Sequence, residues 1–117
     1  MKNKIGIGTA NFGSQYGVNK KQIFKVSAKK ILNISKKNRI NLIDTASEYP
    51  GAEEILGDLN ISKFKIVTKI KIPNNFLKKD ITKIENKFFA SLKKLKVKRV
   101  YALLIQNCDE LLNSNGK

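Results

Sequence analysis

Apolar positions recur along the chain with two different spacings, and these spacings predict strands and helices in turn. Short apolar or alternating runs, typical of β-strands, occur at residues 4–8, 40–44, 65–70 and 100–105. Segments with an apolar residue every three or four positions, as on one face of an amphipathic helix, occur at residues 19–37, 52–59 and 81–95. A further helix is expected to begin at Asp109. The chain therefore predicts the order β-α-β-α-β-α-β, followed by the start of another helix.

Capping residues help to set the expected starts of two helices. Asn19, with Gln22 three positions later, fits a capping box, so the first helix is expected to begin there. Thr82 with Glu85 gives the same pattern for the third helix, and Asp80 is an alternative cap. Both helices are thus expected to have a side-chain hydrogen bond at their amino ends.

The alternation of strands and helices predicts a parallel sheet, because parallel strands need a crossover connection between them. The run at 100–105 is almost continuously apolar, so we expect this strand to be buried on both faces. A doubly wound sheet and a TIM barrel both fit the alternation. The dinucleotide fingerprint of doubly wound sheets enters its helix directly and has a third glycine, whereas Gly6 and Gly8 precede a loop of about ten residues. The glycine spacing therefore argues against the doubly wound sheet.

The charge balance is strongly basic, and it widens the range of partners to consider. The 117 residues, enough for one domain, include 24 lysines and arginines against 9 acidic residues, a net charge of +15. Such a surplus attracts polyanions, so a basic nucleic-acid-binding module is one interpretation. Arg39 and Arg99 are the only arginines, however, and no motif for reading bases occurs. We therefore expect no specific nucleic-acid partner, and interpret the lysines as solvated faces or as electrostatic help for a phosphorylated cofactor.

Other features of the composition exclude several classes of protein. The single cysteine, Cys108, allows no disulfide framework, and the chain has no histidine, the commonest zinc ligand. No apolar run approaches the ~20 residues of a membrane span, and residues 5–10 are too short and glycine-rich for a signal peptide. We expect a soluble cytoplasmic protein with no metal and no membrane partner. Tyr16, Tyr101 and Cys108 are interpreted as packing or loop residues.

Three polar side chains are expected to meet at one edge of the predicted sheet. Asp44 ends the second strand, Lys69 nearly ends the third, and Tyr49 lies in the loop after Asp44. The carboxyl ends of parallel strands share an edge, which is where barrel enzymes have their active sites. A phenol is a weak acid with a pKa of about 10, and a nearby ammonium favours its ionised form. Tyr49 is thus a candidate for proton exchange, Lys69 for stabilising the phenolate, and Asp44 for compensating the charge of Lys69.

The stretch that begins at Asp44 also resembles the signature of the aldo-keto reductase family. The shared features are Asp44-Thr-Ala, Tyr49 five positions later, and a Glu…Leu-Gly helix that ends at Gly57. The resemblance implies a (β/α)8 TIM barrel, an NADPH cofactor, and a small aldehyde or ketone substrate reduced to an alcohol with the proton from Tyr49. A complete barrel needs about 250 residues. We therefore expect residues 1–117 to be the N-terminal half, with about four parallel strands, and to be inactive alone. A natural half-barrel that dimerises is the less favoured alternative.

The resemblance also implies roles for residues of the first loop and for the residue after the fourth strand. Gly8, Thr9 and Asn11 correspond to the loop that contacts the nicotinamide-ribose part of NADPH. Asp44 is also expected to be a cofactor-binding residue. Gln106, in the run Leu-Leu-Ile-Gln-Asn, occupies the place of a histidine that hydrogen-bonds the substrate carbonyl in most members. A glutamine amide donates a hydrogen bond but carries no proton to transfer. A non-catalytic cofactor-binding or regulatory relative is therefore the alternative to an active reductase.

Overall fold

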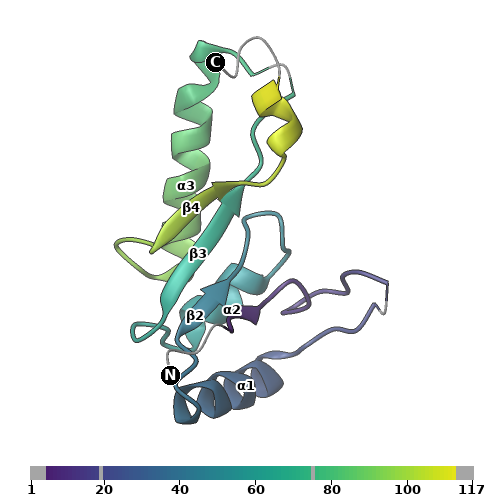
Figure 1. Ribbon diagram of the computed structural model, residues 1–117, viewed down its shortest axis with the longest axis vertical. Helices are drawn as coiled ribbons and strands as arrows, with labels where there is room; N and C mark the ends of the chain where they lie inside the picture. The colour runs from purple at the N-terminus through teal and green to yellow at the C-terminus, as the bar shows by residue number, and fades with distance from the viewer. Residues whose placement is uncertain (1–4, 19, 75, 113–117) are drawn as a thin grey trace.

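The computed structural model describes residues 5–18, 20–74 and 76–112, the side chains at 110 and 111 excepted. Strands and helices alternate along these residues, as the periodicity predicts (Figure 1). In chain order the elements are β1 (Ile7–Gly8), α1 (Lys25–Lys37), β2 (Leu42–Asp44), α2 (Ala52–Asp58), β3 (Lys65–Ile70), η1 (Lys78–Asp80), α3 (Ile81–Leu95), β4 (Ala102–Ile105) and η2 (Cys108–Leu112). The two η elements are short 3-10 helices. None of the described helices has the length and apolar character that a bilayer crossing needs.

The four strands form one parallel sheet in the order β1-β2-β3-β4. Every strand therefore lies beside its neighbour in the chain. This is the strand order of a barrel, because a doubly wound sheet reverses its order at a switch point. The fold is α/β and matches four strands of a (β/α)8 barrel, so the predicted fold class is confirmed.

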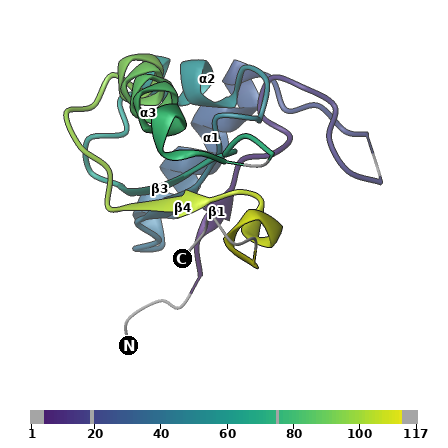
Figure 2. The same ribbon diagram turned by 90° about the horizontal axis from the view of Figure 1, so that it is seen from above.

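The helices cover one face of this sheet. A single buried cluster joins apolar residues of α1, α2 and α3 to residues of β2 and β3. Along β3, burial alternates, so that Ile66, Thr68 and Ile70 face the helices while Val67 and Lys69 face the other way. Figure 2 shows α2 and α3 above β3 and β4 in this arrangement. The other face is the one that lines the inside of a complete barrel.

The expectation that the fourth strand is buried on both faces is wrong. Leu103, Leu104 and Ile105 keep 44, 45 and 37% of their surface exposed. In the described part of the chain β4 pairs only with β3, so it forms the edge of the sheet. Within the described residues, no second layer covers the face away from the helices. The apolar residues of β4 are typical of a strand inside a barrel, but they are exposed because β4 is the edge strand of this sheet.

The expected start of the first helix is also wrong. α1 begins at Lys25 and has no side-chain hydrogen bond at its cap, and Asn19 lies outside the described residues. Ile23 instead forms a parallel bridge with Phe12, and its N–H donates to the carbonyl of Asn11 at 2.7 Å. This pairing keeps the backbone extended up to the residue before the helix, which a capping pattern alone does not predict.

The Thr82–Glu85 capping box is not formed either, because α3 begins at Ile81 without a side-chain cap. Asp80, the alternative cap, accepts hydrogen bonds from Lys83 Nζ at 2.8 Å and from the Leu77 N–H at 3.1 Å. The bond from Lys83, followed by that from Leu77, lowers the pKa of Asp80. Its carboxylate therefore stabilises the turn before the helix. The helix expected from residue 109 is the single 3-10 turn η2, and β1, β2 and β4 begin later than predicted.

Asp58 connects the end of α2 to two neighbouring segments through ion pairs. Its Oδ2 lies 2.7 Å from Lys25 Nζ and its Oδ1 lies 2.6 Å from Lys96 Nζ. Hydrogen bonds from Lys25 and then from Lys96 lower the pKa of the Asp58 carboxyl to about 2. The folded state thus favours the ionised form of this group.

Replacing Asp58 by asparagine is expected to lower the thermal stability at neutral pH and to weaken its acid dependence. The folded-state pKa of about 2 lies below the unfolded value of about 3.9. The stabilisation is therefore present above about pH 4 and is lost as the pH falls towards 2. Thermal melts of wild type and variant should differ at neutral pH and converge near pH 2. Glu85→Gln, which removes an exposed acid, is the control, and a pH-independent difference for Asp58→Asn would contradict the prediction.

Candidate active site

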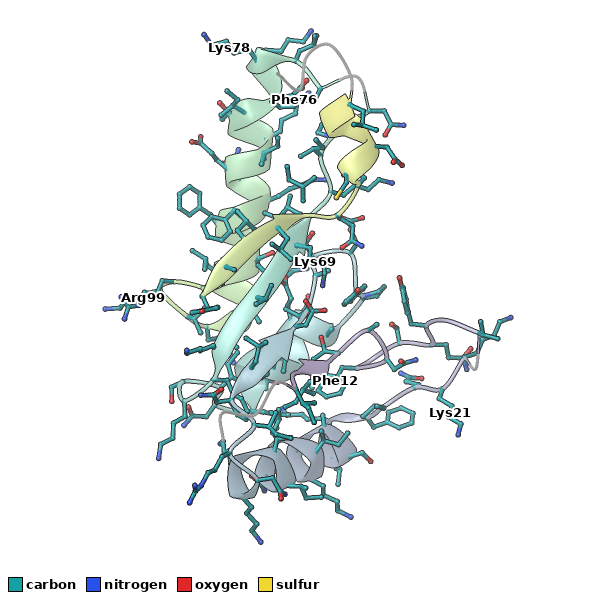
Figure 3. All side chains as sticks on the ribbon, viewed as in Figure 1. Phe12, Lys21, Lys69, Phe76, Lys78 and Arg99 are labelled. Atoms are coloured by element: carbon teal, nitrogen blue, oxygen red, sulfur yellow. The ribbon has the colours of Figure 1, made fainter. Side chains whose placement is uncertain are left out.

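The carboxyl ends of β2 and β3 bring Asp44 and Lys69 together, as the strand assignment predicts. Asp44 pairs with Val67 in the parallel register, so Lys69 lies two positions further along the neighbouring strand. Lys69 Nζ donates hydrogen bonds to Asp44 Oδ2 at 2.7 Å and to the carbonyl of Thr45 at 2.9 Å. Figure 3 labels Lys69 near the middle of the molecule, above the end of β2. The predicted contact between the acid and the lysine is thus present.

The ammonium group of Lys69 is shielded from water and held in place. Its side chain is 17% exposed, against 43% for Asp44. A shielded cation is unfavourable unless an anion and hydrogen-bond acceptors compensate it. The Asp44 carboxylate and the Thr45 carbonyl supply both. They use two of the three N–H donors of the ammonium, so one donor is left for a further acceptor.

Tyr49 lies beside this ammonium. Lys69 Nζ is 5.4 Å from the centre of the Tyr49 ring, within the range of a cation–π contact. The ring of Tyr16 packs edge-on against Tyr49, with centroids 5.1 Å apart and an angle of 61° between the planes. No hydrogen bond joins Lys69 Nζ to the Tyr49 hydroxyl in the described structure. The contact of the ammonium is therefore with the ring of Tyr49.

A tight turn sets the position of Tyr49. The N–H of Ala52 donates to the carbonyl of Tyr49 at 3.1 Å, and Gly51 between them has φ of 78°. Pro50 and Gly51 are the residues that a type II turn favours at its two central positions, because only glycine adopts this φ readily. A Cβ at Gly13 would lie 3.2 Å from the Gly51 carbonyl carbon, so the first loop packs closely on the turn. The local sequence thus explains the position of the phenol.

The first loop is bonded to β2 through Thr9. Thr9 is fully buried, and its N–H and hydroxyl donate to the carbonyl of Asp44 at 3.1 and 3.0 Å. The Asn11 side-chain amide donates to the carbonyls of Tyr16 and Lys21 at 2.8 and 2.7 Å. Thr9 therefore fixes the first loop to Asp44, and Asn11 holds the later part of the loop together.

The sheet face beside Asp44 is open at Gly8. Gly8 pairs with Asp44 in the β1–β2 register, and a Cβ at this position would meet no atom within 4 Å. Gly6, two residues earlier, is different, because a Cβ there would lie 3.2 Å from the Leu42 side chain. The open position is thus at the same end of the sheet as Asp44 and Tyr49, where a flat ligand has room to approach the backbone.

Gln106 stands apart from these residues. It follows β4, and its N–H donates to the carbonyl of the last residue of β3 at 3.0 Å. Its Oε1 is buried and has no hydrogen-bond partner in the described structure. The next residue, Asn107, accepts from the Ile72 N–H at 3.0 Å and donates to the Ile72 carbonyl at 3.2 Å. Among the described residues, no hydrogen bond joins Gln106 to the Asp44–Lys69 pair.

Two contacts around the site were missed by the sequence interpretation. Tyr16, interpreted as a packing or loop residue, lies against the candidate proton donor. Glu53 of α2 is 2% exposed and accepts a hydrogen bond from Thr68 Oγ1 at 2.8 Å, one residue before Lys69. The polar Thr68 at a helix-facing position of β3 was the signal that could have indicated a buried polar partner. These contacts extend the site to the first loop and to α2.

Together, the barrel strands and the aspartate, tyrosine and lysine at their carboxyl ends define a class of protein. The model of the aldo/keto reductase family matches residues 4–113, and the chain belongs to this family. The resemblance seen in the sequence is therefore confirmed. No curated protein sequence matches the chain significantly.

Solved structures with the same fold include proteins from two bacteria. A protein from Pseudomonas aeruginosa, described as an aldo-keto reductase, is 28% identical with a TM-score of 0.74, over 93% of this chain and 46% of its own. An aldo/keto reductase from Klebsiella pneumoniae, in complex with NADP and acetate, is 19% identical with a TM-score of 0.61. That match covers 86% of this chain and 34% of the Klebsiella protein. The chain thus spans less than half the length of these proteins.

Proposed function

We propose that these residues form the N-terminal half of a soluble, cytoplasmic, NADPH-dependent reductase that converts an aldehyde or ketone to an alcohol. The observation that carries the proposal is the contact of Lys69 with both Asp44 and the ring of Tyr49. A phenol beside a held ammonium is suited to give a proton to an oxygen that becomes negatively charged. Family membership supports the same reaction class.

Each residue of the site has a distinct part in this proposal. Tyr49 donates the proton to the substrate oxygen, and its hydroxyl then carries the negative charge until it is reprotonated. Lys69 lowers the free energy of that phenolate because its positive charge lies close to the ring. Asp44 orients the ammonium and compensates its charge, through the hydrogen bond of 2.7 Å. None of these proposed steps requires a histidine.

The open face at Gly8 supports a nicotinamide cofactor at this end of the sheet. A side chain at Gly8 would project into free space beside Asp44, so a flat ring has room there. The Asn11 Oδ1 and the backbone of Gly8 and Thr9 are the groups of the first loop proposed to hold it. When bound, NADPH supplies the hydride for the carbonyl carbon. The NADP bound by the Klebsiella pneumoniae protein gives this cofactor assignment further support.

The second candidate function is a relative that binds the cofactor without turnover, and Gln106 is the observation that favours it. An amide in place of an imidazole polarises a carbonyl less strongly, because it carries no charge. In an active reductase, by contrast, Gln106 is proposed to donate a hydrogen bond to the carbonyl. Among the described residues its buried Oε1 has no donor, so an amide rotation that turns the NH2 group towards the substrate is compatible with the site.

The experiment that tests the proposal is an NADPH oxidation assay with the full-length gene product and a panel of aldehydes and ketones. Carbonyl-dependent consumption of NADPH is the expected result. Residues 1–117 alone should give none, because β4 and the inner face of the sheet are left uncovered. Tight NADPH binding by the full-length product without turnover of any carbonyl would instead establish the non-catalytic relative. Absence of both binding and turnover would reject both functions.

A further inference from the structure

A pocket lies at the amino ends of β3 and β4, the opposite end of the strands from Tyr49. It is lined by the segment 61–64 before β3, by the first two residues of β3, and by the loop 96–101 before β4. The backbone N–H of Tyr101 donates to the Ile66 carbonyl at 2.7 Å and so joins the loop before β4 to β3. The cavity volume is about 700 Å³. This lies within the range of about 300–1,000 Å³ that is usual for small-molecule sites.

All the charged residues that line this pocket are cations, namely Lys65, Lys96, Lys98 and Arg99. Lys96 is paired with Asp58 at 2.6 Å. Within the described residues, Lys65, Lys98 and Arg99 have no carboxylate within ion-pair distance. Figure 3 shows Arg99 projecting from the loop that precedes β4. Three uncompensated positive charges therefore surround one cavity, which favours an anionic ligand.

The uncharged lining of the pocket limits the ligand further. Ile61, Phe64 and Ile66 form a buried apolar floor, with exposures of 2, 8 and 3%. Tyr101 is 64% exposed, and Lys65 Nζ lies 4.8 Å from the centre of its ring. An exposed phenol ring beside cations provides a stacking surface for a planar group. The pocket thus combines sites for negative charge with an apolar and aromatic surface.

We propose that this pocket binds a small phosphate ester with a planar ring, of the nucleoside diphosphate class. The phosphates contact Lys98 and Arg99, since guanidinium groups match phosphate oxygens in geometry. The ring stacks on Tyr101 above the apolar floor. Because the pocket and the Asp44–Lys69 site lie at opposite ends of the strands, this ligand is separate from the carbonyl substrate. A long nucleic acid is disfavoured, because the lining comes only from two short loops and the start of β3.

Calorimetric titration of the full chain with ADP, in ~150 mM salt that screens diffuse attraction, tests the proposal. The double variant Lys98→Gln/Arg99→Gln is expected to weaken ADP binding by about tenfold or more, because it removes charge-assisted hydrogen bonds. The matched control Lys29→Gln/Lys30→Gln removes the same charge from the exposed side of α1 and should change the affinity by less than about twofold. Circular dichroism checks that each variant is folded.

Two further titrations distinguish the contribution of the ring from that of the phosphates, and a free nucleotide from a dinucleotide. Tyr101→Ala should weaken ADP by about tenfold through lost stacking, while inorganic pyrophosphate binding is unchanged. If the affinity for NADPH falls in the Lys98→Gln/Arg99→Gln variant, the pocket binds the dinucleotide. If the affinity for NADPH is unchanged, the pocket binds free nucleotides. The proposal is overturned if ADP does not bind, or if the Lys29→Gln/Lys30→Gln control loses as much ADP affinity as the pocket variant. It is also overturned if single-stranded RNA binds more tightly than ADP and keeps its affinity in the pocket variant.

Discussion

Replacing Tyr49 by phenylalanine in the full-length gene product is expected to reduce kcat/KM for carbonyl reduction by about 10²–10⁴-fold. The variant keeps the aromatic ring, and therefore the packing against Tyr16 and the contact with Lys69. It removes only the hydroxyl that is proposed to donate the proton. NADPH consumption with a substrate of the wild-type enzyme is the measurement.

NADPH affinity provides the internal control for this variant, because the phenol hydroxyl is assigned to proton transfer and not to the cofactor. Binding of NADPH, followed by its fluorescence, should persist in Tyr49→Phe. A kcat/KM value close to that of wild type would exclude Tyr49 as the proton donor. A loss of NADPH binding together with activity would mean that the hydroxyl acts in binding, which also contradicts the assigned role.

Replacing Gly57 by alanine is expected to destabilise the protein by about 2–3 kcal/mol, the upper part of the range for overpacked sites. In most helices the same change is stabilising, because alanine has the higher helix propensity. Gly57 lies where α2 meets the end of α3, and a Cβ there would overlap the backbone carbonyl of Lys94. A backbone atom cannot rotate away as a flexible side chain can, so the two helices must separate.

The measurement for Gly57→Ala is thermal unfolding, where a loss of this size should lower Tm by about ten degrees or more. Gly8→Ala is the matched control for stability, because a Cβ at Gly8 would meet no atom within 4 Å. Its Tm should stay close to that of wild type. A higher Tm for Gly57→Ala would show that α2 and α3 are further apart than described.

The sequence was sufficient for the alternation of parallel strands with helices and for the contact of Asp44 with Lys69. Both depend on local rules, since apolar runs mark strands and the ends of neighbouring parallel strands share an edge. The contact between the acid and the lysine was therefore predicted from residues within one β-α-β unit. Tyr49 was placed near them because it lies in the loop that follows Asp44.

The features that the sequence did not predict depend on contacts between distant residues. The extended stretch before α1 is held by the pairing of Ile23 with Phe12, which no helical pattern contains. The exposure of β4 depends on whether a second layer lies against its other face, and none does among the described residues. The buried Glu53 is explained only by the Thr68 hydroxyl that it meets across the space between helix and sheet. In each case the local structure or burial is determined by a contact with a distant part of the chain and not by the residue type alone.

The hydrogen bond between Lys69 and Asp44 spans only 25 positions of the chain. Both partners of this bond lie within the unit β2-α2-β3, so the bond needs no contact with the edge strand β4. The electrostatic centre of the proposed chemistry is thus contained in one β-α-β unit, whereas the face that must enclose the substrate needs strands beyond it.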